Sequence, residues 1–211
     1  MPSRPSPLEW PEILPPAFFP VGLNLVGRKC VLIGAGDDRE AIEKDAALRA
    51  AGAEVAWLQS GADLRDEDLS DAYFVILTTQ DEALAARLRR LADDRRFLFC
   101  AIDQPAYGFV AMTAVVSAGR ARIAISTGGA APRVAAILRA KLQSALNERF
   151  ARFLECLAQQ RRRARANNAD SQERRSMMRC AADGFDVEIR VTYPAWFDGA
   201  EPFGPCIVDE R

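Results

Sequence analysis

Histidine is absent from this sequence. Its absence excludes the Ser-His-Asp triad, the Cys-His catalytic pair and every metal site that relies on imidazole ligands. Proton transfer and metal contact must therefore fall to carboxylates, tyrosine, cysteine, lysine or the backbone. Lysine is scarce as well, because Lys29, Lys44 and Lys141 are the only ones. Arginine thus supplies almost all of the positive charge.

Long apolar runs and paired cysteines are missing too. No stretch reaches the roughly 18 to 20 apolar residues of a membrane-spanning helix, and the N-terminus lacks the apolar segment of a signal peptide. We therefore expect a cytoplasmic protein with no membrane contact. The five cysteines are scattered, with no C-x-x-C pair, which predicts reduced structural thiols and no zinc or redox motif.

What the sequence does contain predicts one full domain and a smaller second one. A chain of 211 residues with 49% hydrophobic residues can build a sizeable core. The net charge of -1 gives no general reason to expect nucleic-acid binding. Three consecutive arginines at residues 161–163 lie in a helical segment of mixed charge, and we interpret them as a solvated face.

Strands alternate with helices from residue 21 onward. Buried-type strands are predicted at residues 30–33, 54–58, 73–78 and 97–102, and helices at 40–51 and 82–92. We expect Gly52 to end the first helix in a left-handed conformation. The alternation is typical of an α/β fold with a parallel, Rossmann-type sheet and right-handed crossovers. Residues 1–20 hold seven prolines and are expected to form an extended arm.

A glycine pair follows the first predicted strand. The sequence VLIGAG at residues 31–36 matches a dinucleotide-binding turn, in which Gly34 permits the tight turn and Gly36 lets the backbone approach a pyrophosphate. Arg39 replaces the third glycine of that motif, and Asp37 and Asp38 lie in the loop. A plain strand-to-helix turn explains the same glycines. Asp38 either repels a pyrophosphate or caps the helix, and Arg39 either offsets that repulsion or contacts a phosphate.

The pattern changes after residue 108. Strands at residues 109–117 and 122–126, joined by a turn at Gly119, predict a hairpin, and Pro132 suits the first turn of a helix that runs to residue 146. An arginine-rich helix at 150–165, a polar break and a short tail follow. The expected domains are a Rossmann-type NAD-binding domain at 21–108, a β-β-α dimerisation domain at 109–148 and a helical C-terminal region at 149–211.

Four segments resemble, in order, the N-terminal region of the siroheme synthase family. They are FPVGLNLVGRK at residues 19–29, the glycine loop, IDQP at 102–105 and ISTGGAAP at 125–132, and the likeness covers about residues 17–146. The resemblance implies NAD-dependent oxidation of precorrin-2 to sirohydrochlorin, followed in some members by insertion of ferrous iron. It also implies a homodimer that binds the tetrapyrrole between its domains.

The resemblance assigns candidate site residues. Asp103 matches an aspartate implicated in dehydrogenation and chelation, which makes it the candidate catalytic residue and metal contact. A carboxylate at the carboxyl edge of a parallel sheet faces the ligand crevice, and a turn cap explains it as well. The candidate cofactor-binding residues are Gly34, Gly36, Asp37, Asp38, Ser60, Gly61, Thr78 and Thr79. The candidate substrate-binding residues are Ser126, Thr127, Gly128, Gly129 and Arg133, with Arg120 and Arg122 as further electrostatic partners.

Ordinary structural roles compete at most of these positions. Ser60 and Gly61 fit a plain loop, the two threonines fit β-branched strand residues, and the segment at 126–129 fits a helix cap. Cys100 and Ala111 stand where the family pattern has asparagine and proline, which bears on how the pocket edge is built. No acidic residue ends the second strand, so NAD and NADP both remain open.

Two other functions stay open beside the dehydrogenase. The first is a tetrapyrrole-binding protein or chelatase of the same fold that no longer oxidises its ligand, which the irregular Asp38–Arg39 loop favours. The second is an NAD-binding redox sensor, which would bind the cofactor without a tetrapyrrole.

Overall fold

The structure of the protein is a computed structural model that describes residues 18–167, 170–195 and 197. Most of the predicted proline-rich arm at residues 1–20 lies outside the described residues, and so do Trp196 and the end of the tail. The chain divides into two compact units, Met1–Arg152 and Phe153–Arg211. No helix in the described part of the chain is long and apolar enough to cross a bilayer.

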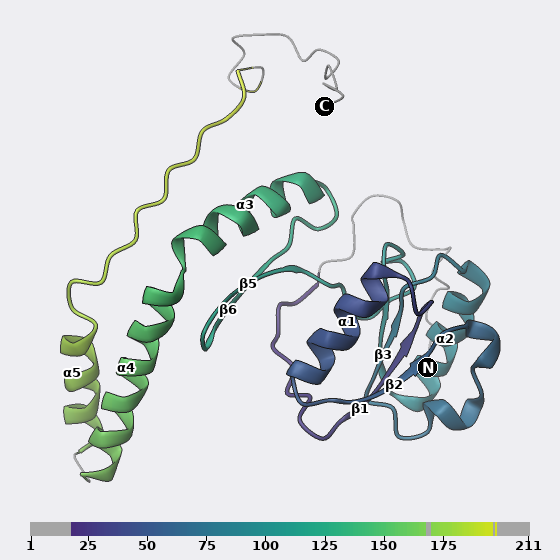
Figure 1. Ribbon diagram of the computed structural model, residues 1–211, viewed down its shortest axis with the longest axis horizontal. Helices are drawn as coiled ribbons and strands as arrows, with labels where there is room; N and C mark the ends of the chain where they lie inside the picture. Colours follow the sequence, from purple (N-terminus) through teal and green to yellow (C-terminus); the bar gives the residue numbers. More distant parts are fainter. Residues whose placement is uncertain (1–17, 168–169, 196, 198–211) are drawn as a thin grey trace, which may run out of the picture. The chain divides into compact units, whose positions relative to one another are not determined.

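A four-stranded parallel sheet forms the core of the first unit (Figure 1). Its strands are β1 (Lys29–Ile33), β2 (Glu54–Leu58), β3 (Phe74–Leu77) and β4 (Leu98–Ala101), in the order β2-β1-β3-β4. Leu32 pairs with Trp57 on one side and with Ile76 on the other, so β1 lies at the centre. The predicted α/β fold with a Rossmann-type parallel sheet is confirmed.

Two helices cover opposite faces of this sheet, as Figure 1 shows. Successive strand side chains point to opposite faces, and two apolar clusters result. One contains Val31, Val75 and Phe99 together with residues of α2 (Glu82–Arg95). The other contains Leu32 and Ile76 together with residues of α1 (Arg39–Ala50). Apart from Lys29 and Glu54 at the starts of β1 and β2, the strand residues are apolar, because helices cover both faces of the sheet.

The ends of α1 and α2 are fixed by their caps. Asp38 accepts a hydrogen bond from the Glu40 amide at 2.9 Å, and Asp81 accepts one from the Leu84 amide at 2.9 Å. Gly52 follows α1 with a φ of 82°, as predicted for a left-handed C-terminal residue. The segment between β2 and β3 forms two short 3-10 helices, η2 (Gly61–Asp63) and η3 (Asp66–Leu69).

The predicted hairpin is present but shorter than expected. It consists of β5 (Ala114–Ala118) and β6 (Ala121–Ile125), with Gly119 in the turn at a φ of 57°. The prediction of a strand from residue 109 is wrong. The amides of Phe109 and Val110 both donate to the Phe99 carbonyl, at 2.8 and 3.0 Å, which turns residues 109–113 back onto β4.

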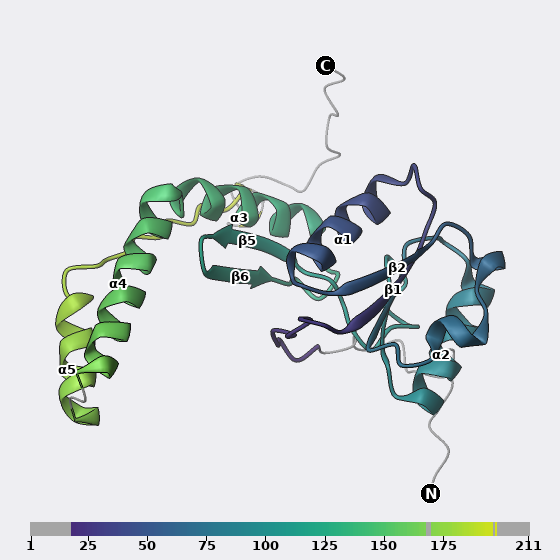
Figure 2. The same ribbon diagram turned by 60° about the horizontal axis from the view of Figure 1, so that its bottom comes forward.

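Helix α3 (Pro132–Ala145) packs along the hairpin (Figure 2). Gln143 joins them in both directions: its Oε1 accepts from the Ser117 amide at 3.1 Å, and its Nε2 donates to the Ser117 carbonyl at 2.9 Å. Pro132 lies in the first turn of the helix, as predicted.

Two antiparallel helices follow. α4 (Glu148–Ala166) begins in the first unit and continues into the second, and α5 (Ser171–Ala181) lies beside it (Figure 1). The sequence predicted a helical C-terminal region at 149–211, but it placed a polar break and a tail, with no second helix, where α5 forms. Asp170, part of that break, caps α5 by accepting from the Gln172 amide at 2.8 Å. Phe153 and Phe185 stack with their ring centroids 5.2 Å apart.

Candidate functional site at the carboxyl edge of the sheet

Gly34 leaves β1 at the point where the strand order reverses, between β1 and β3. Its amide donates to the Leu58 carbonyl at 3.0 Å, and its carbonyl accepts from the Trp57 indole at 2.8 Å. A Cβ at this position would collide with the hydroxyl of Thr78 and lie 3.1 Å from the Ala41 Cβ. Only glycine therefore lets the loop pack this closely against β3, and ligands of open α/β sheets bind at such a switch point.

The next part of the loop offers free hydrogen-bond donors. Gly36 and Asp37 are exposed, and within the described residues their backbone amides donate to no protein acceptor. A Cβ on Gly36 would lie 3.1 Å from the amide group of Gln59. Successive free amides before a helix can hold an anion. The backbone therefore fits the expected pyrophosphate.

The side chains around that helix terminus are mostly carboxylates, which carry the same negative charge as a pyrophosphate. Asp38 uses both carboxylate oxygens: Oδ1 accepts from the Glu40 amide at 2.9 Å, and Oδ2 accepts from the Thr78 hydroxyl at 2.7 Å. These two hydrogen bonds, the one from Thr78 foremost, hold the pKa of Asp38 below its ordinary value. The capping role of Asp38 is therefore present in the structure, and the carboxylate lies at the end of α1 where an anion would bind.

Arg39 does not offset this charge at the loop. Its Nε donates to Glu43 at 2.9 Å, one turn further along α1, and its side chain is 91% exposed. The cavity beside the helix terminus has a volume of about 420 Å³ and is lined by Asp38, Arg39, Glu40 and Glu43. Three carboxylates and one guanidinium thus face this cavity.

The ends of β3 and β4 are joined by two glutamines that sequence reasoning missed. Gln80 Nε2 donates to the Ile102 carbonyl at 3.3 Å, and Gln104 Nε2 donates to the Thr79 carbonyl at 3.1 Å. Gln104 Oε1 is buried and has no partner among the described residues. The glutamines follow the two strand ends in the sequence, but only the adjacency of β3 and β4 shows that each glutamine donates to a carbonyl just beyond the other strand.

Asp103 lies just beyond β4, exposed and with a φ of 59°. The Gln104 amide donates to the Ala101 carbonyl at 3.2 Å, so Asp103 is the second central residue of a tight turn. Glycine or asparagine is the usual choice at such a position. Aspartate is also among the residues that adopt this conformation, and the turn leaves the Asp103 carboxylate exposed at the carboxyl edge of the sheet.

A buried arginine of α2 anchors the loop after Asp103. Arg89 of α2 donates to the carbonyls of Tyr107 and Gly108, both at 3.3 Å. Its guanidinium lies 3.7 Å from the ring centroid of Phe109. This arrangement fixes the chain between the Asp103 turn and the hairpin.

Ser60 and Gly61 have local structural roles in this structure. The Ser60 hydroxyl accepts from the Ala62 amide at 3.1 Å and so caps η2. A Cβ on Gly61 would collide with the Leu84 side chain, so glycine lets η2 pack against α2. Gln59, which the sequence reasoning did not select, is the residue at the end of β2 that lies against the glycine loop.

The segment before α3 bonds most of its own amides. The Ser126 hydroxyl accepts from the Gly128 amide at 3.2 Å, and the Thr127 hydroxyl accepts from the Ala131 amide at 3.3 Å. Gly128 and Gly129 have φ values of 62° and 81°. The residue that precedes α3, Ala131, supplies no side-chain cap, unlike Asp38 on α1. Among the described residues, the amides of Gly129 and Arg133 donate to no protein acceptor, and these two could meet an anion.

The remaining candidates are placed as follows. Arg133 is exposed in the first turn of α3. Arg122 donates to the carbonyls of Gly119 and Ala121 at 2.6 and 2.8 Å and so braces the hairpin turn. Cys100 is buried among the apolar side chains on the α1 face, and this burial raises the pKa of its thiol to about 11. Cys100 therefore packs inside the sheet instead of lining a pocket edge.

The fold and the glycine loop are those of the dinucleotide-binding class of α/β domains, and a β-β-α unit follows. Two family models match the chain in these places. The model for the NAD(P)-binding family matches residues 21–114. The model for the central part of sirohaem biosynthesis proteins matches residues 123–145.

Curated relatives and a solved structure are also similar to this chain. The siroheme synthase of Nitrosococcus oceani is 29% identical over 69% of this chain and 35% of its own length. The siroheme synthase of Xylella fastidiosa is 32% identical over 75% of this chain and 37% of its own length. SirC, precorrin-2 dehydrogenase, superposes with a TM-score of 0.64 at 20% identity, covering 79% of this chain and 90% of that one.

These findings confirm the resemblance to the siroheme synthase N-terminal family. The chain is related in sequence to siroheme synthases and has the fold of SirC. It spans about a third of the length of the siroheme synthases named here.

Proposed function

We propose that this protein oxidises precorrin-2 to sirohydrochlorin with NAD as the hydride acceptor. One observation carries the proposal: the glycine loop with its free amides and the left-handed Asp103 follow parallel strands of one sheet, at its carboxyl edge. The matches to siroheme biosynthesis proteins and to NAD(P)-binding domains support the substrate and the cofactor.

The domain at residues 21–108 would hold the cofactor. The amides of Gly36 and Asp37 would donate to the pyrophosphate, and Gly34 would keep the loop against β3. Thr78 and Thr79, at the end of β3, would border the reacting end of the cofactor, and Ser60 and Gly61 its ribose. When bound, the nicotinamide supplies the hydride-accepting chemistry.

Asp103 would accept the proton that leaves the macrocycle. Its carboxylate is exposed, and the turn around it is fixed by Gln104, which is bonded to the end of β3. With no histidine in the chain, a carboxylate is the natural general base at this position. The proposal assigns to the residues at the start of α3, Ser126, Thr127, Gly128, Gly129 and Arg133, the binding of substrate carboxylates.

Insertion of ferrous iron is a further step that we keep within the proposal. In the described part of the chain, no three histidine, cysteine, aspartate or glutamate side chains gather in a way that could hold a metal ion. We assign the contact between iron and the protein to Asp103, and the tetrapyrrole would supply the remaining ligands. Iron enters this scheme as a substrate.

We also propose that the chain works as a homodimer through residues 109–148. Several large apolar side chains of the hairpin and of α3 are exposed: Val115, Ile123, Val134, Ile137 and Leu138. Apolar faces of this kind mark protein contacts, and a second copy would cover them. The four described cysteines are free thiols, which supports the cytoplasm as the location.

The test is to mix the purified protein with precorrin-2 and NAD and to follow the absorbance of NADH. Parallel reactions with NADP decide which cofactor is used. Formation of NADH that depends on precorrin-2 supports the proposal. Its absence, under conditions in which a known precorrin-2 dehydrogenase is active, would refute it.

A specific observation favours a second function, a tetrapyrrole-binding protein or chelatase of this fold that does not use NAD. The Asp38 carboxylate already lies at the end of α1 and faces a cavity lined by two further carboxylates. Calorimetric titration with NAD separates the two functions. Saturable NAD binding removes the basis of this second function, whereas tetrapyrrole binding without NAD binding supports it.

A further inference from the structure

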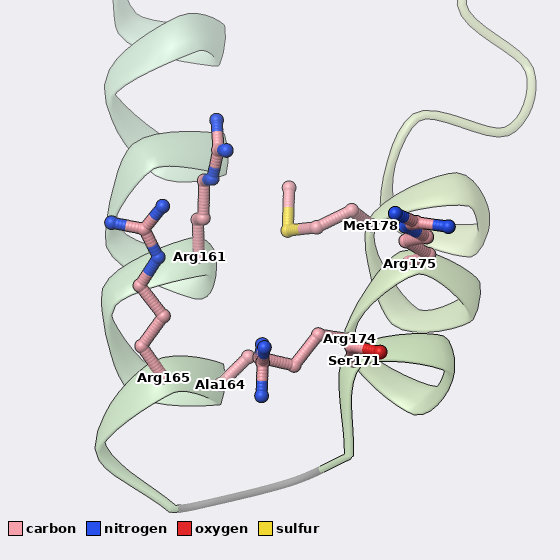
Figure 3. A pocket seen from close by; sticks show the side chains of 7 residues that line it. All are labelled: Arg161, Ala164, Arg165, Ser171, Arg174, Arg175 and Met178. Carbon is pink, nitrogen blue, oxygen red and sulfur yellow. The ribbon is translucent and has the colours of Figure 1, made fainter.

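A cavity lined by arginines lies between α4 and α5 (Figure 3). Its volume is about 420 Å³. The lining residues are Arg161, Ala164, Arg165, Ser171, Arg174, Arg175 and Met178. Among the lining residues that the structure describes, four are arginines and none is acidic.

The sequence spacing explains why these side chains meet. Residues 161, 164 and 165 follow the i, i+3, i+4 pattern of one face of α4, and residues 171, 174, 175 and 178 follow the i, i+3, i+4, i+7 pattern of one face of α5. In Figure 3, Arg174 and Met178 extend from α5 toward α4, and Arg161 rises from α4 beside the gap. Each helix thus presents one face to the same space.

Three of the four arginines that line this cavity form no ion pair with any carboxylate in the described part of the chain. Within the described residues, Arg161, Arg165 and Arg175 have no carboxylate within ion-pair distance, whereas the neighbouring Arg162 pairs with Glu155 at 3.0 Å. Arg174 differs from these three arginines, because its charge contributes to the lowered pKa of Asp170, after the backbone hydrogen bonds from Gln172 and Ser171.

The walls of the cavity combine this charge with apolar surface. Ala164 is 2% exposed and Met178 is half-buried, so both contribute apolar surface between the two cationic faces. The Ser171 hydroxyl adds one polar group at the start of α5. A pocket of a few hundred Å³ suits a small molecule and is too small for a folded partner.

We propose that this cavity binds a small polyanion, a molecule that carries two or more phosphate or carboxylate groups. The planar guanidinium groups of arginine form paired hydrogen bonds with both kinds of group. Like charges that face one cavity repel each other, and an anion between them removes that repulsion. The inference concerns the helical unit alone and does not depend on the proposed dehydrogenase activity.

The experiment is calorimetric titration of the full chain at low ionic strength with pyrophosphate and, separately, with citrate. We expect saturable binding of at least one of them, weakening as salt is added. The double variant R161Q/R175Q should bind roughly tenfold or more weakly, since it loses two charge-assisted contacts. Circular dichroism would verify that the variant keeps its helices.

Matched controls lie on the same two helices. Arg163 and Arg179 do not line the cavity, so R163Q/R179Q makes the same charge change and should bind as the unmodified protein does. Tighter binding of pyrophosphate assigns a phosphate ligand, and tighter binding of citrate assigns a carboxylate ligand. No saturable binding, an equal loss in the control, or a preference for a single-stranded oligonucleotide over both small anions would overturn the proposal.

Discussion

The Thr78 hydroxyl donates a 2.7 Å hydrogen bond to the carboxylate of Asp38, across 40 residues of sequence. This bond ties the end of β3 to the start of α1 directly beside Gly34. It also holds a negative charge at the helix terminus that a pyrophosphate would approach. The same pair therefore stabilises the shape of the cofactor loop and opposes the charge of its expected ligand.

Replacing Asp38 by asparagine should strengthen NAD binding. Asparagine is as good an N-cap as aspartate, and its amide can keep both hydrogen-bond partners. The change removes one negative charge near the pyrophosphate, so the affinity for NAD should rise severalfold at low salt. Calorimetric titration with NAD measures the change.

The matched control for D38N is D81N. Asp81 caps α2 in the same way but lies at a helix that follows no glycine loop. NAD affinity should be the same in D81N and in the unmodified protein. Weaker NAD binding in D38N would show that the Asp38 carboxylate supports the cofactor.

Asp38 should also make stability depend on pH in the acid range. Its folded-state pKa is lowered from 3.8, chiefly by the Thr78 hydroxyl. A lowered pKa contributes stability that is complete above the unfolded-state pKa and is lost as the pH falls through the folded-state pKa. Urea unfolding between pH 5 and pH 2 should show a smaller loss of stability in D38N than in the unmodified protein. Identical pH profiles would contradict this role of Asp38.

Variants of Asp103 should separate catalysis from folding. D103N should lower kcat for precorrin-2 oxidation by about a hundredfold or more, because it removes a general base. D103G should be equally inactive and yet more stable by about 1 kcal/mol, since glycine adopts a positive φ without strain. Thermal unfolding and initial rates measure the two effects.

Asp71 provides the control, because it is exposed, belongs to no proposed site and has the same φ of 59°. D71G should gain similar stability and retain full activity. A fully active D103N would show that Asp103 serves only the turn.

Gly34→Ala should destabilise the domain, because the added Cβ meets the Thr78 hydroxyl and lies 3.1 Å from the Ala41 Cβ. Forced overlap of this kind costs about 1 to 3 kcal/mol. Removing the hydroxyl in the double variant G34A/T78A should restore part of the loss. Chemical unfolding of the two variants tests this, and a G34A protein of undiminished stability would mean that the loop can move away from β3.

Local sequence patterns were enough to predict the strands of the parallel sheet, but they did not predict every other helix and strand correctly. Continuous apolar runs predicted the four strands because both faces of the sheet are covered. Residues 109–113 are similarly apolar and were predicted as part of a strand. The amides of Phe109 and Val110 instead both donate to the Phe99 carbonyl, so they do not pair with a neighbouring strand of the hairpin. Helix α5 was missed because its charged sequence contains few apolar residues and no buried one.

The candidate site was predictable where its signals are local. Gly34, Gly36 and the cap at Asp38 lie within one short segment, and Asp103 follows a strong strand. The contacts of Gln80 and Gln104 were not predictable, because they depend on β3 and β4 being neighbours in the sheet. The same holds for Asp38 and Thr78, whose contact requires β1 next to β3.

The most direct measurement is the balance of products when the protein is incubated with precorrin-2 and NAD. The account predicts sirohydrochlorin and NADH in equal amounts, at a rate that D103N lowers about a hundredfold or more. Sirohydrochlorin without NADH, or neither product in a reaction where a known precorrin-2 dehydrogenase forms both, would contradict it.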